Sequence, residues 1–236
     1  MITSRHNEKL KLIRRLQRRR SREADGLFVG EGEDLLLAAR EAGREPVELL
    51  TAGGADLGGT EVEPGLLDSV AALGSGTRAI GVWRESWAER LGSPCTYLHG
   101  VTDPGNVGTI VRTAGALVGG TVVIGPGCAD PFGPRAVRAS MGAVFSQPLS
   151  RAGLEATPEP RAALVARGGA GLESVQGAAT ICLGGEREGL PRSALERCDH
   201  RVTIPLRPGA ESLNVAAAAA IALQRISSPA SEEDDD

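Results

Sequence analysis

Three polar segments of the sequence each follow an apolar stretch that is a predicted strand. They span residues 103–112, 184–191 and 207–214. Strands that alternate with helices predict a parallel sheet with both faces covered. Ligands on such sheets bind in the crevice beyond the carboxyl ends of the strands. We therefore expect the three segments to meet at one ligand site.

The first segment combines a helix start with a cationic side chain. Pro104-Gly105 predicts a turn, and Asn106 can cap the helix that follows. Gly108 allows another backbone or a ligand to come close. Arg112 lies six residues after Asn106 and could bind a phosphate through two parallel hydrogen bonds. The alternative is a surface arginine paired with a carboxylate.

The second segment begins with two glycines at the end of a predicted buried strand. Gly184 and Gly185 indicate close approach by a flat or bulky ligand. Glu186 follows them and could accept hydrogen bonds from that ligand or from neighbouring amides. The alternative is a turn that carries exposed charges. The glycines do not fit the GxGxxG pattern, so an ordinary dinucleotide fold is not supported.

The third segment connects a predicted strand at residues 201–206 to an alanine-rich helix. Pro208-Gly209 ends the strand, and the alanines after Asn214 favour a helix. Free N–H groups at the start of that helix suit a polar ligand. The alternative is that Ser212 caps the helix and Asn214 occupies its first turn.

In this order and at this spacing, the segments resemble the SpoU (TrmH-like) family of RNA ribose 2′-O-methyltransferases, within the SPOUT superfamily. The matching residues are Asn106-x-Gly108-x-x-x-Arg112, Leu183-Gly184-Gly185-Glu186-x-x-Gly189-Leu190, Ile204-Pro205-Leu206, Glu211-Ser212-Leu213-Asn214-Val215-Ala216, Pro134, and Arg138-Ala139-Ser140-x-Gly142-Ala143. The match covers about residues 95–226. Residues 28–32 more loosely resemble the start of the family's N-terminal RNA-binding domain. The sequence departs from the family pattern at Arg135, where many members carry lysine, and at Gly30.

The resemblance implies an α/β fold. Its C-terminal SPOUT domain would have a parallel sheet and a deep trefoil knot, a rare exception to unknotted topology. A small N-terminal α/β domain, similar to a ribosomal protein, would precede it. The family is dimeric, and its active site takes residues from both subunits. A homodimer is therefore expected.

The resemblance also implies a cofactor and a set of site residues. S-adenosylmethionine would be bound without a metal, at Gly184, Ile204, Leu213, Gly185, Leu183 and Pro205. The catalytic positions that match are Arg112, Asn106, Glu186, Ser212 and Asn214. The sequence leaves two roles open for Arg112, that of the base and that of an orienting group. Because a guanidinium keeps its proton near neutral pH, the preferred role is to hold the neighbouring phosphate and the attacking oxygen. Ser212 and Asn214 would orient the ribose or Arg112.

The distribution of charge suggests where RNA would bind. The net charge of −4 argues weakly against a nucleic-acid partner, but basic residues crowd a helix predicted at residues 3–20. Such a patch matters more for phosphate contacts than the total charge. The expected RNA-binding residues are Arg14, Arg15, Arg18, Arg19, Arg135 and Arg138. A solvated helix face is the alternative.

Length and composition are sufficient for one large domain or two small ones. The chain has 236 residues, of which 41% are apolar, and a Gly- and Ser-containing stretch at residues 85–94 marks the boundary. We expect an N-terminal RNA substrate-binding domain at residues 1–92, a SPOUT methyltransferase domain at 93–228 and a disordered acidic tail at 229–236. With no membrane-spanning run or secretion signal, a cytoplasmic protein is expected. Four cysteines and three histidines without ligand spacing predict reduced thiols and no structural zinc.

Several functions compatible with these residues differ in their RNA target or lack catalysis. A shortened family member that acts on transfer RNA would lack the N-terminal domain, so ribosomal RNA is the preferred substrate. Methylation of transfer RNA is one alternative. A catalytically silent RNA-binding or ribosome-assembly protein of the same fold is another, but the intact set of polar motif residues argues against it. A nicotinamide-dependent enzyme is disfavoured by the missing dinucleotide fingerprint.

Overall fold

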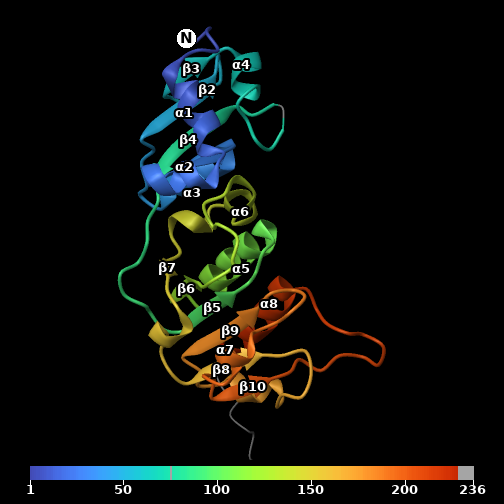
Figure 1. The fold of residues 1–236 in the computed structure, drawn as a ribbon. Helices are drawn as coiled ribbons and strands as arrows, with labels where there is room; N and C mark the ends of the chain where they lie inside the picture. The colour runs from blue at the N-terminus through green and yellow to red at the C-terminus, as the bar shows by residue number, and fades with distance from the viewer. Residues whose placement is uncertain (75, 228–236) are drawn as a thin grey trace, which may run out of the picture.

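The computed structural model describes residues 1–74 and 76–227, which form two β-sheets with helices packed around them (Figure 1). The strands are β1 Leu27–Glu31, β2 Glu48–Ala52, β3 Thr60–Val62, β4 Ala79–Arg84, β5 Cys95–His99, β6 Thr121–Ile124, β7 Leu149–Arg151, β8 Arg161–Leu164, β9 Thr180–Gly184 and β10 His200–Val202. The α-helices are α1 Glu8–Leu16, α2 Arg19–Asp25, α3 Glu33–Glu41, α4 Pro64–Asp68, α5 Pro104–Leu117, α6 Pro134–Ala139, α7 Arg192–Leu195 and α8 Val215–Ser227. Short 3₁₀ helices lie at Ala143–Phe145, Leu154–Ala156 and Leu172–Val175. In the described ranges no helix combines the length and the apolar character needed to cross a bilayer.

The N-terminal sheet has the strand order β1-β4-β2-β3 and is antiparallel except for the β2–β3 pair. The single helix predicted at residues 3–20 is wrong, because α1 ends at Leu16 and α2 begins at Arg19. Arg22 folds back and donates from Nη1 to the carbonyls of Leu16 (2.8 Å) and Gln17 (3.0 Å). These bonds satisfy carbonyl groups that a continuous helix would have used itself.

Two further helix predictions in this half are wrong at their ends. The helix predicted from Glu31 starts at Glu33, because Gly32 adopts a φ of 110° and Glu31 belongs to β1. The helix predicted over residues 64–73 ends at Asp68. The buried Glu31 carboxylate accepts hydrogen bonds from the amides of Ala72 (2.7 Å) and Leu73 (3.2 Å). Hydrogen bonds to Glu31, which is distant in sequence, thus take the place of the helical hydrogen bonds that the last turn would have made.

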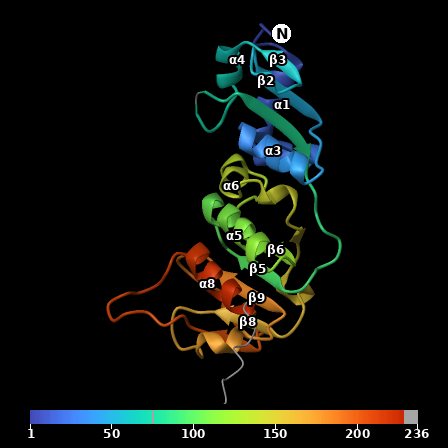
Figure 2. The same cartoon turned by 180° about the vertical axis from the view of Figure 1, so that it is seen from behind.

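The C-terminal sheet is parallel throughout, with the order β10-β8-β9-β5-β6-β7. Helices α5 and α8 pack against one another and cover one face of the sheet. In Figure 2, which views the molecule from behind, both helices lie in front of the strands. α7 packs with the small cluster on the opposite face. This confirms the predicted α/β architecture with a parallel sheet.

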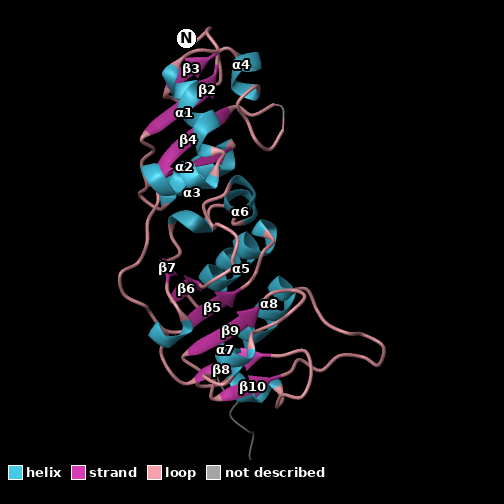
Figure 3. Cartoon of the chain, viewed as in Figure 1, coloured by secondary structure: helices cyan, strands magenta, loops and turns pink. Residues whose placement is uncertain are grey.

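The strand predicted at residues 201–206 is shorter in the structure. β10 pairs with β8, and the last pair joins Val202 to Leu164, where β8 also ends. On its other side it meets only an isolated bridge between Val202 and Ala170 among the described residues, and the amide of Thr203 donates to the carbonyl of Ala170. Residues 203–214 therefore form the long loop between β10 and α8 (Figure 3). β3 and β7, each of three residues, were missed because they are too short to show a period.

One hydrophobic cluster joins the two halves of the molecule. Phe28 lies 4.9 Å from Phe132, measured between ring centroids, and Trp83 lies 4.9 Å from Phe145. The first residue of each pair belongs to the N-terminal sheet and the second to the C-terminal half. The stretch at residues 85–94 therefore connects two sheets that share a core.

Ion pairs reinforce the same junction. Arg22 of α2 lies 2.7 Å from Asp130, and each side chain is only 5% exposed. Asp130 also accepts the amide of Phe132 at 2.9 Å, so it is bonded on both oxygens. Arg138 of α6 contacts Asp34 of α3 at 2.6 Å nearer the surface. The N-terminal half is thus fixed to the other half by polar as well as apolar contacts.

Candidate functional site

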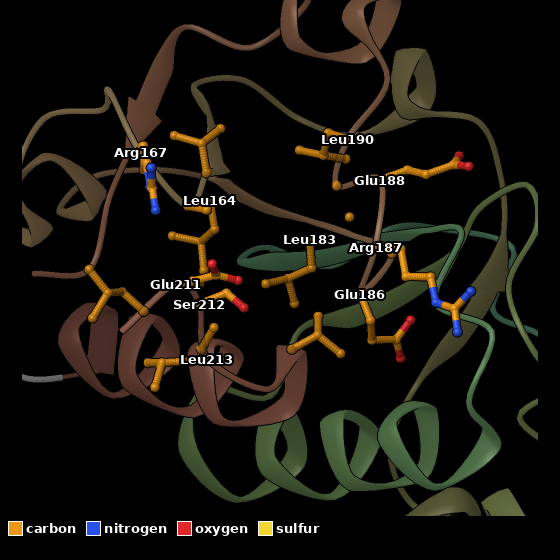
Figure 4. Close-up of a pocket in the computed structure, with 18 of the residues that line it drawn as sticks. Leu164, Arg167, Leu183, Glu186, Arg187, Glu188, Leu190, Glu211, Ser212 and Leu213 are labelled. Carbon is orange, nitrogen blue, oxygen red and sulfur yellow. The ribbon is translucent and has the colours of Figure 1, made fainter. Parts of the chain in front are cut away.

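A cavity of about 680 Å³ lies at the carboxyl ends of β8, β9 and β10. Residues after all three strands line it, so its position agrees with the rule for open parallel sheets. The lining residues are Leu164–Arg167, Leu183–Leu190, Leu195, Val202, Ile204, Leu206, Glu211–Leu213, Val215 and Ala218. Figure 4 shows Leu183 near the centre, between Glu186 with Arg187 on one side and Glu211 with Ser212 on the other.

The loop after β9 is a tight turn that requires its glycines. The amide of Gly189 donates to the carbonyl of Gly185 at 2.9 Å, and Gly189 has a φ of 67°. A Cβ at Gly184 would collide with the backbone of Gly189, and one at Gly185 with the carbonyl of Gly100. The sequence suggested that these glycines make room for a ligand. In the structure they make room for neighbouring backbone, which shapes one wall of the cavity.

Gly108 has a similar role in helix packing. A Cβ at this position would collide with the carbonyl of Ala136 in α6. Of the two possibilities that the sequence left open, close approach of another backbone is therefore the one observed. This contact fixes α5 against α6 and hence the direction in which α5 leaves the sheet.

A chain of side-chain hydrogen bonds joins the three motif segments. Asp103 caps α5 by accepting the amide of Asn106 at 2.9 Å, so the predicted cap at Asn106 is wrong. The Nδ2 of Asn106 donates to Oε1 of Glu186 at 2.7 Å. The Nδ2 of Asn214 donates to Oδ1 of Asn106 at 3.1 Å. Asn106 therefore connects the loop after β9 with the start of α8. We call Asn106, Glu186 and Asn214 the Asn106 relay.

Asn214 also begins α8. Its Oδ1 accepts hydrogen bonds from the amides of Ala216 (2.8 Å) and Ala217 (3.3 Å). The alternative in which Ser212 caps this helix is therefore wrong. Ser212 is instead an exposed residue that lines the cavity.

Arg112 lies outside the cavity of its own chain. It is exposed on α5, and the described part of the chain offers it no hydrogen-bond or ion-pair partner. Six residues of helix turn it about 240° past Asn106. The structure thus brings Asn106, Glu186 and Asn214 together, but does not bring Arg112 to them within one chain.

Most of the residues predicted to bind a cofactor lie around the cavity. Leu183, Gly184, Gly185, Ile204 and Leu213 line it, whereas Pro205 is exposed and does not. The sequence did not single out the segment after β8, residues 164–167. This segment has no unusual composition, and only its place at the end of a neighbouring parallel strand would have indicated it.

The predicted RNA-binding arginines of the first two helices mostly have partners within the chain. Arg14 donates to the carbonyl of Arg5, Arg15 pairs with Asp25 and Arg19 pairs with Glu23, at distances of 2.9, 2.8 and 2.9 Å. The side chain of Arg18 is exposed and has no hydrogen-bond or ion-pair partner among residues 1–74 and 76–227. Exposed ion pairs contribute about 0–1 kcal/mol, so these arginines can exchange a carboxylate for a phosphate.

The two predicted RNA-binding arginines of α6 differ from each other. Arg135 is 70% exposed and lies 3.7 Å from Asp103. Arg138 is held at 2.6 Å by Asp34 of the N-terminal half. Arg138 thus helps to hold the two halves together, while Arg135 lies beside the start of α5.

Burial affects the ionisation of two side chains on the strands of the C-terminal sheet. Burial raises the pKa of Tyr97 to about 12, and its hydroxyl lies 3.1 Å from Nδ1 of His99. A hydrogen bond with Cys198, together with burial, raises the pKa of the Cys182 thiol above its usual value. The cysteines are free thiols, three of them buried. The charged residues that line the cavity are Arg167, Glu186, Arg187, Glu188 and Glu211.

Comparisons with known proteins agree with this geometry. The model of the SpoU rRNA Methylase family matches residues 95–224. An uncharacterized tRNA/rRNA methyltransferase of Mycobacterium tuberculosis is 36% identical over 170 residues, which cover 65% of this chain and 53% of the relative. The 23S rRNA (guanosine(2553)-2′-O)-methyltransferase RlmP of Bacillus subtilis is 35% identical, over 52% of this chain and 54% of the relative. The chain thus spans about half the length of these curated relatives.

A solved structure is similar over nearly the whole chain. The rRNA methyltransferase from Sinorhizobium meliloti has a TM-score of 0.81 and 26% sequence identity, and the match covers 95% of each chain. An rRNA methyltransferase from that organism has also been solved with AdoMet bound. The family model matches more than half of the 236 residues, and the chain belongs to the SpoU rRNA methylase family.

Proposed function

We propose that the chain transfers a methyl group from S-adenosylmethionine to a ribose 2′-hydroxyl of RNA, with ribosomal RNA as the substrate. The observation that carries this proposal is the Asn106 relay, which holds three motif segments around one cavity. The names of the relatives support the reaction and the RNA class: RlmP is a 23S rRNA 2′-O-methyltransferase. The N-terminal half fits the preference for ribosomal RNA, because it adds a surface that folded RNA can contact.

The cavity suits S-adenosylmethionine in size and chemistry. Its volume of about 680 Å³ falls within the range of about 300–1,000 Å³ that is usual for such ligands. Leu164, Leu183 and Ile204 line it and would offer apolar contact to the adenine. Glu211 also lines it, and its carboxylate would suit a positive group of the cofactor. When bound, the cofactor supplies an electrophilic methyl group, so the protein need only place the nucleophile.

The residues of the chain then position the ribose and stabilise the developing alkoxide. Arg112 holds the phosphate beside the reacting ribose and the attacking oxygen, because its guanidinium donates two parallel bonds and keeps its proton. Ser212 orients the ribose from the cavity rim. Asn106, Glu186 and Asn214 hold the loop after β9 and the start of α8 at a fixed separation.

A homodimer would bring Arg112 to the site. Arg112 lies on the exposed side of α5, and α5 packs on α8, where Ile221 is 38% exposed. Leu213, beside the start of α8, is also 38% exposed. A second copy that covers this face would bury both apolar side chains and place Arg112 of the partner subunit beside the cavity.

We also propose that the C-terminal domain contains the trefoil knot. Residues 203–214 would then pass through a loop formed by the preceding part of the chain.

Methyl transfer to isolated RNA tests this function. The purified chain is incubated with labelled S-adenosylmethionine and deproteinised bacterial ribosomal RNA, with transfer RNA in a parallel reaction. We expect label in ribosomal RNA, in dinucleotides that resist alkaline hydrolysis because the 2′-hydroxyl is blocked. Label in transfer RNA alone would change the substrate. RNA binding without transfer would indicate a silent RNA-binding protein.

The Asn106 relay predicts a paired exchange of side chains. Asn106→Asp places a second carboxylate beside Glu186, and we expect the affinity for S-adenosylmethionine to fall about tenfold because of the repulsion. The helix itself is not harmed, since an acidic residue suits the first turn of α5. Calorimetry of cofactor binding measures the effect.

The double variant Asn106→Asp/Glu186→Gln is the matched control. Its new amide can donate to the new carboxylate, and Asn214 keeps its acceptor, so cofactor affinity is expected to return to within about threefold of wild type. If the double variant binds no better than Asn106→Asp, the relay does not organise the cavity. Restored binding without restored methyl transfer would indicate that the charge of Glu186 acts in the reaction itself.

A further inference from the structure

A second groove lies along the same edge of the C-terminal sheet as the cavity. It has a volume of about 410 Å³ and follows the carboxyl ends of β6 and β7. Its lining residues are Arg19, Ile124–Cys128 and Arg151–Gly153. Because β6 neighbours β5 and β5 neighbours β9, the groove lies only about 10 Å along the edge from the loop after β9.

Arg151 is held in place in this groove by a ring from the connecting segment. Its guanidinium carbon lies 4.2 Å from the centroid of the Trp87 ring. Trp87 in turn donates from Nε1 to Glu85 at 2.9 Å and makes an edge contact with Phe132 at 5.0 Å. The α2 helix, the connecting segment and the end of β7 thus meet at this point. The guanidinium is positioned before any ligand arrives, which lowers the entropy cost of binding.

Two arginines in the groove share one carboxylate. Glu23 accepts from Nε of Arg19 at 2.9 Å and lies 3.7 Å from Nη2 of Arg151. The hydrogen bond from Arg19 lowers the pKa of Glu23, so Glu23 stays ionised. All three side chains are partly exposed, by 55%, 42% and 38% for Arg19, Arg151 and Glu23. A carboxylate between two guanidiniums occupies the place that a phosphate oxygen would take.

We infer that this groove binds a backbone phosphate of the RNA substrate, which displaces Glu23 from Arg19 and Arg151. The inference deepens the proposed function, because it names a contact of the RNA outside the methyl-transfer cavity. The groove and the cavity share one edge of the sheet, so one RNA segment can reach both. Glu23 holds the two arginines ready for the phosphate and weakens the affinity for other anions. Arg18, which precedes Arg19 in the sequence, is also exposed.

Opposite charge changes in the groove test the inference. Arg151→Gln is expected to raise the dissociation constant for deproteinised ribosomal RNA about five- to tenfold. It should also flatten the salt dependence of binding by about 0.7 in the log–log slope, the value for one phosphate contact on single-stranded RNA. Glu23→Gln is expected to tighten binding about threefold, because the phosphate no longer has a competitor. Arg151→Lys keeps the charge and should retain most of the salt slope.

A matched pair elsewhere in the chain provides the control. Arg192 and Glu196 in and after α7 form the same i,i+4 contact, at 2.7 Å. Glu196 lies near Arg161, the first residue of β8 and therefore at the opposite edge of the sheet. Arg192→Gln and Glu196→Gln should leave both the RNA affinity and the salt slope unchanged.

The outcomes separate this inference from the proposed function. If wild type methylates RNA, Arg151→Gln should raise the KM for RNA while the single-turnover rate at saturating RNA stays unchanged. If wild type transfers no methyl group, the proposed function fails, but the binding measurements still decide about the groove. Wild-type affinity in both Arg151→Gln and Glu23→Gln would overturn the inference. Weaker binding by both variants would also overturn it, since that result indicates a structural role for the pair.

Discussion

Replacing Arg112 with alanine is expected to reduce methyl transfer about a thousandfold while fold and cofactor binding stay intact. A donor that stabilises developing charge typically contributes about 10²–10³-fold in rate, and Arg112 would also hold the phosphate. Its exposed side chain has no partner in the described ranges, so the stability should change by less than about 0.5 kcal/mol. Single-turnover rates, melting temperature and calorimetry of cofactor binding together check this.

The conservative replacement and a distant arginine serve as controls. Arg112→Lys should recover only part of the rate, because an ammonium cannot make the two parallel bonds of a guanidinium. Arg192→Ala removes another exposed arginine and should leave the rate unchanged. Wild-type turnover by Arg112→Ala would remove this residue from the mechanism.

Mixing two inactive variants tests whether Arg112 acts across a dimer. Gly184→Ala would deform the loop after β9, because its Cβ would collide with Gly189. In a random mixture with Arg112→Ala, half of the dimers pair one chain of each kind, and each of these has one complete site if Arg112 acts in the partner's cavity. About a quarter of wild-type activity should then return. If the mixture stays inactive, Arg112 does not act across subunits.

Asp130→Ala is expected to cost about 3–5 kcal/mol of folding stability, the usual effect of leaving one partner of a buried ion pair uncompensated. Arg22 and Asp130 are each only 5% exposed. For a chain of this size we expect the melting temperature to fall by about 10 °C. Calorimetry or denaturant unfolding measures the loss.

An exposed ion pair gives the control for this prediction. Glu196→Ala breaks the contact with Arg192. The side chain of Glu196 is 56% exposed and that of Arg192 is 91% exposed, so the loss should be less than about 1 kcal/mol. Asp130→Asn keeps an acceptor for the amide of Phe132 and should fall between the two. A loss below about 1 kcal/mol for Asp130→Ala would contradict the importance of this buried pair.

The sequence predicted the C-terminal sheet well because its signals are local. Short apolar strands bounded by glycine and proline can be recognised within a few residues, as at β6 and β9. The convergence of three loops at one edge then followed from the parallel order alone. The end of β10 could not be predicted in this way, because it depends on where β8, the strand with which it pairs, ends.

The partners of individual side chains were beyond the reach of the sequence. Asn106 and Glu186 are 80 residues apart, and both Asn214 with Asn106 and Arg22 with Asp130 are 108 apart. No local pattern distinguishes Arg22, which is buried, from Arg18, which is exposed, although both lie in one basic run. Their difference arises from which side of a broken helix meets the other half of the chain.

The aromatic cluster between the sheets has a consequence for how this protein could change over evolution. Phe132 and Phe145 belong to the C-terminal half but are covered by Phe28 and Trp83 of the N-terminal half. A shortened descendant without the first sheet would expose these rings as an apolar patch that favours aggregation. Deletion of the N-terminal half would therefore require polar replacements at both phenylalanines at the same time. Because such combined changes are rare, the two halves are expected to be inherited together.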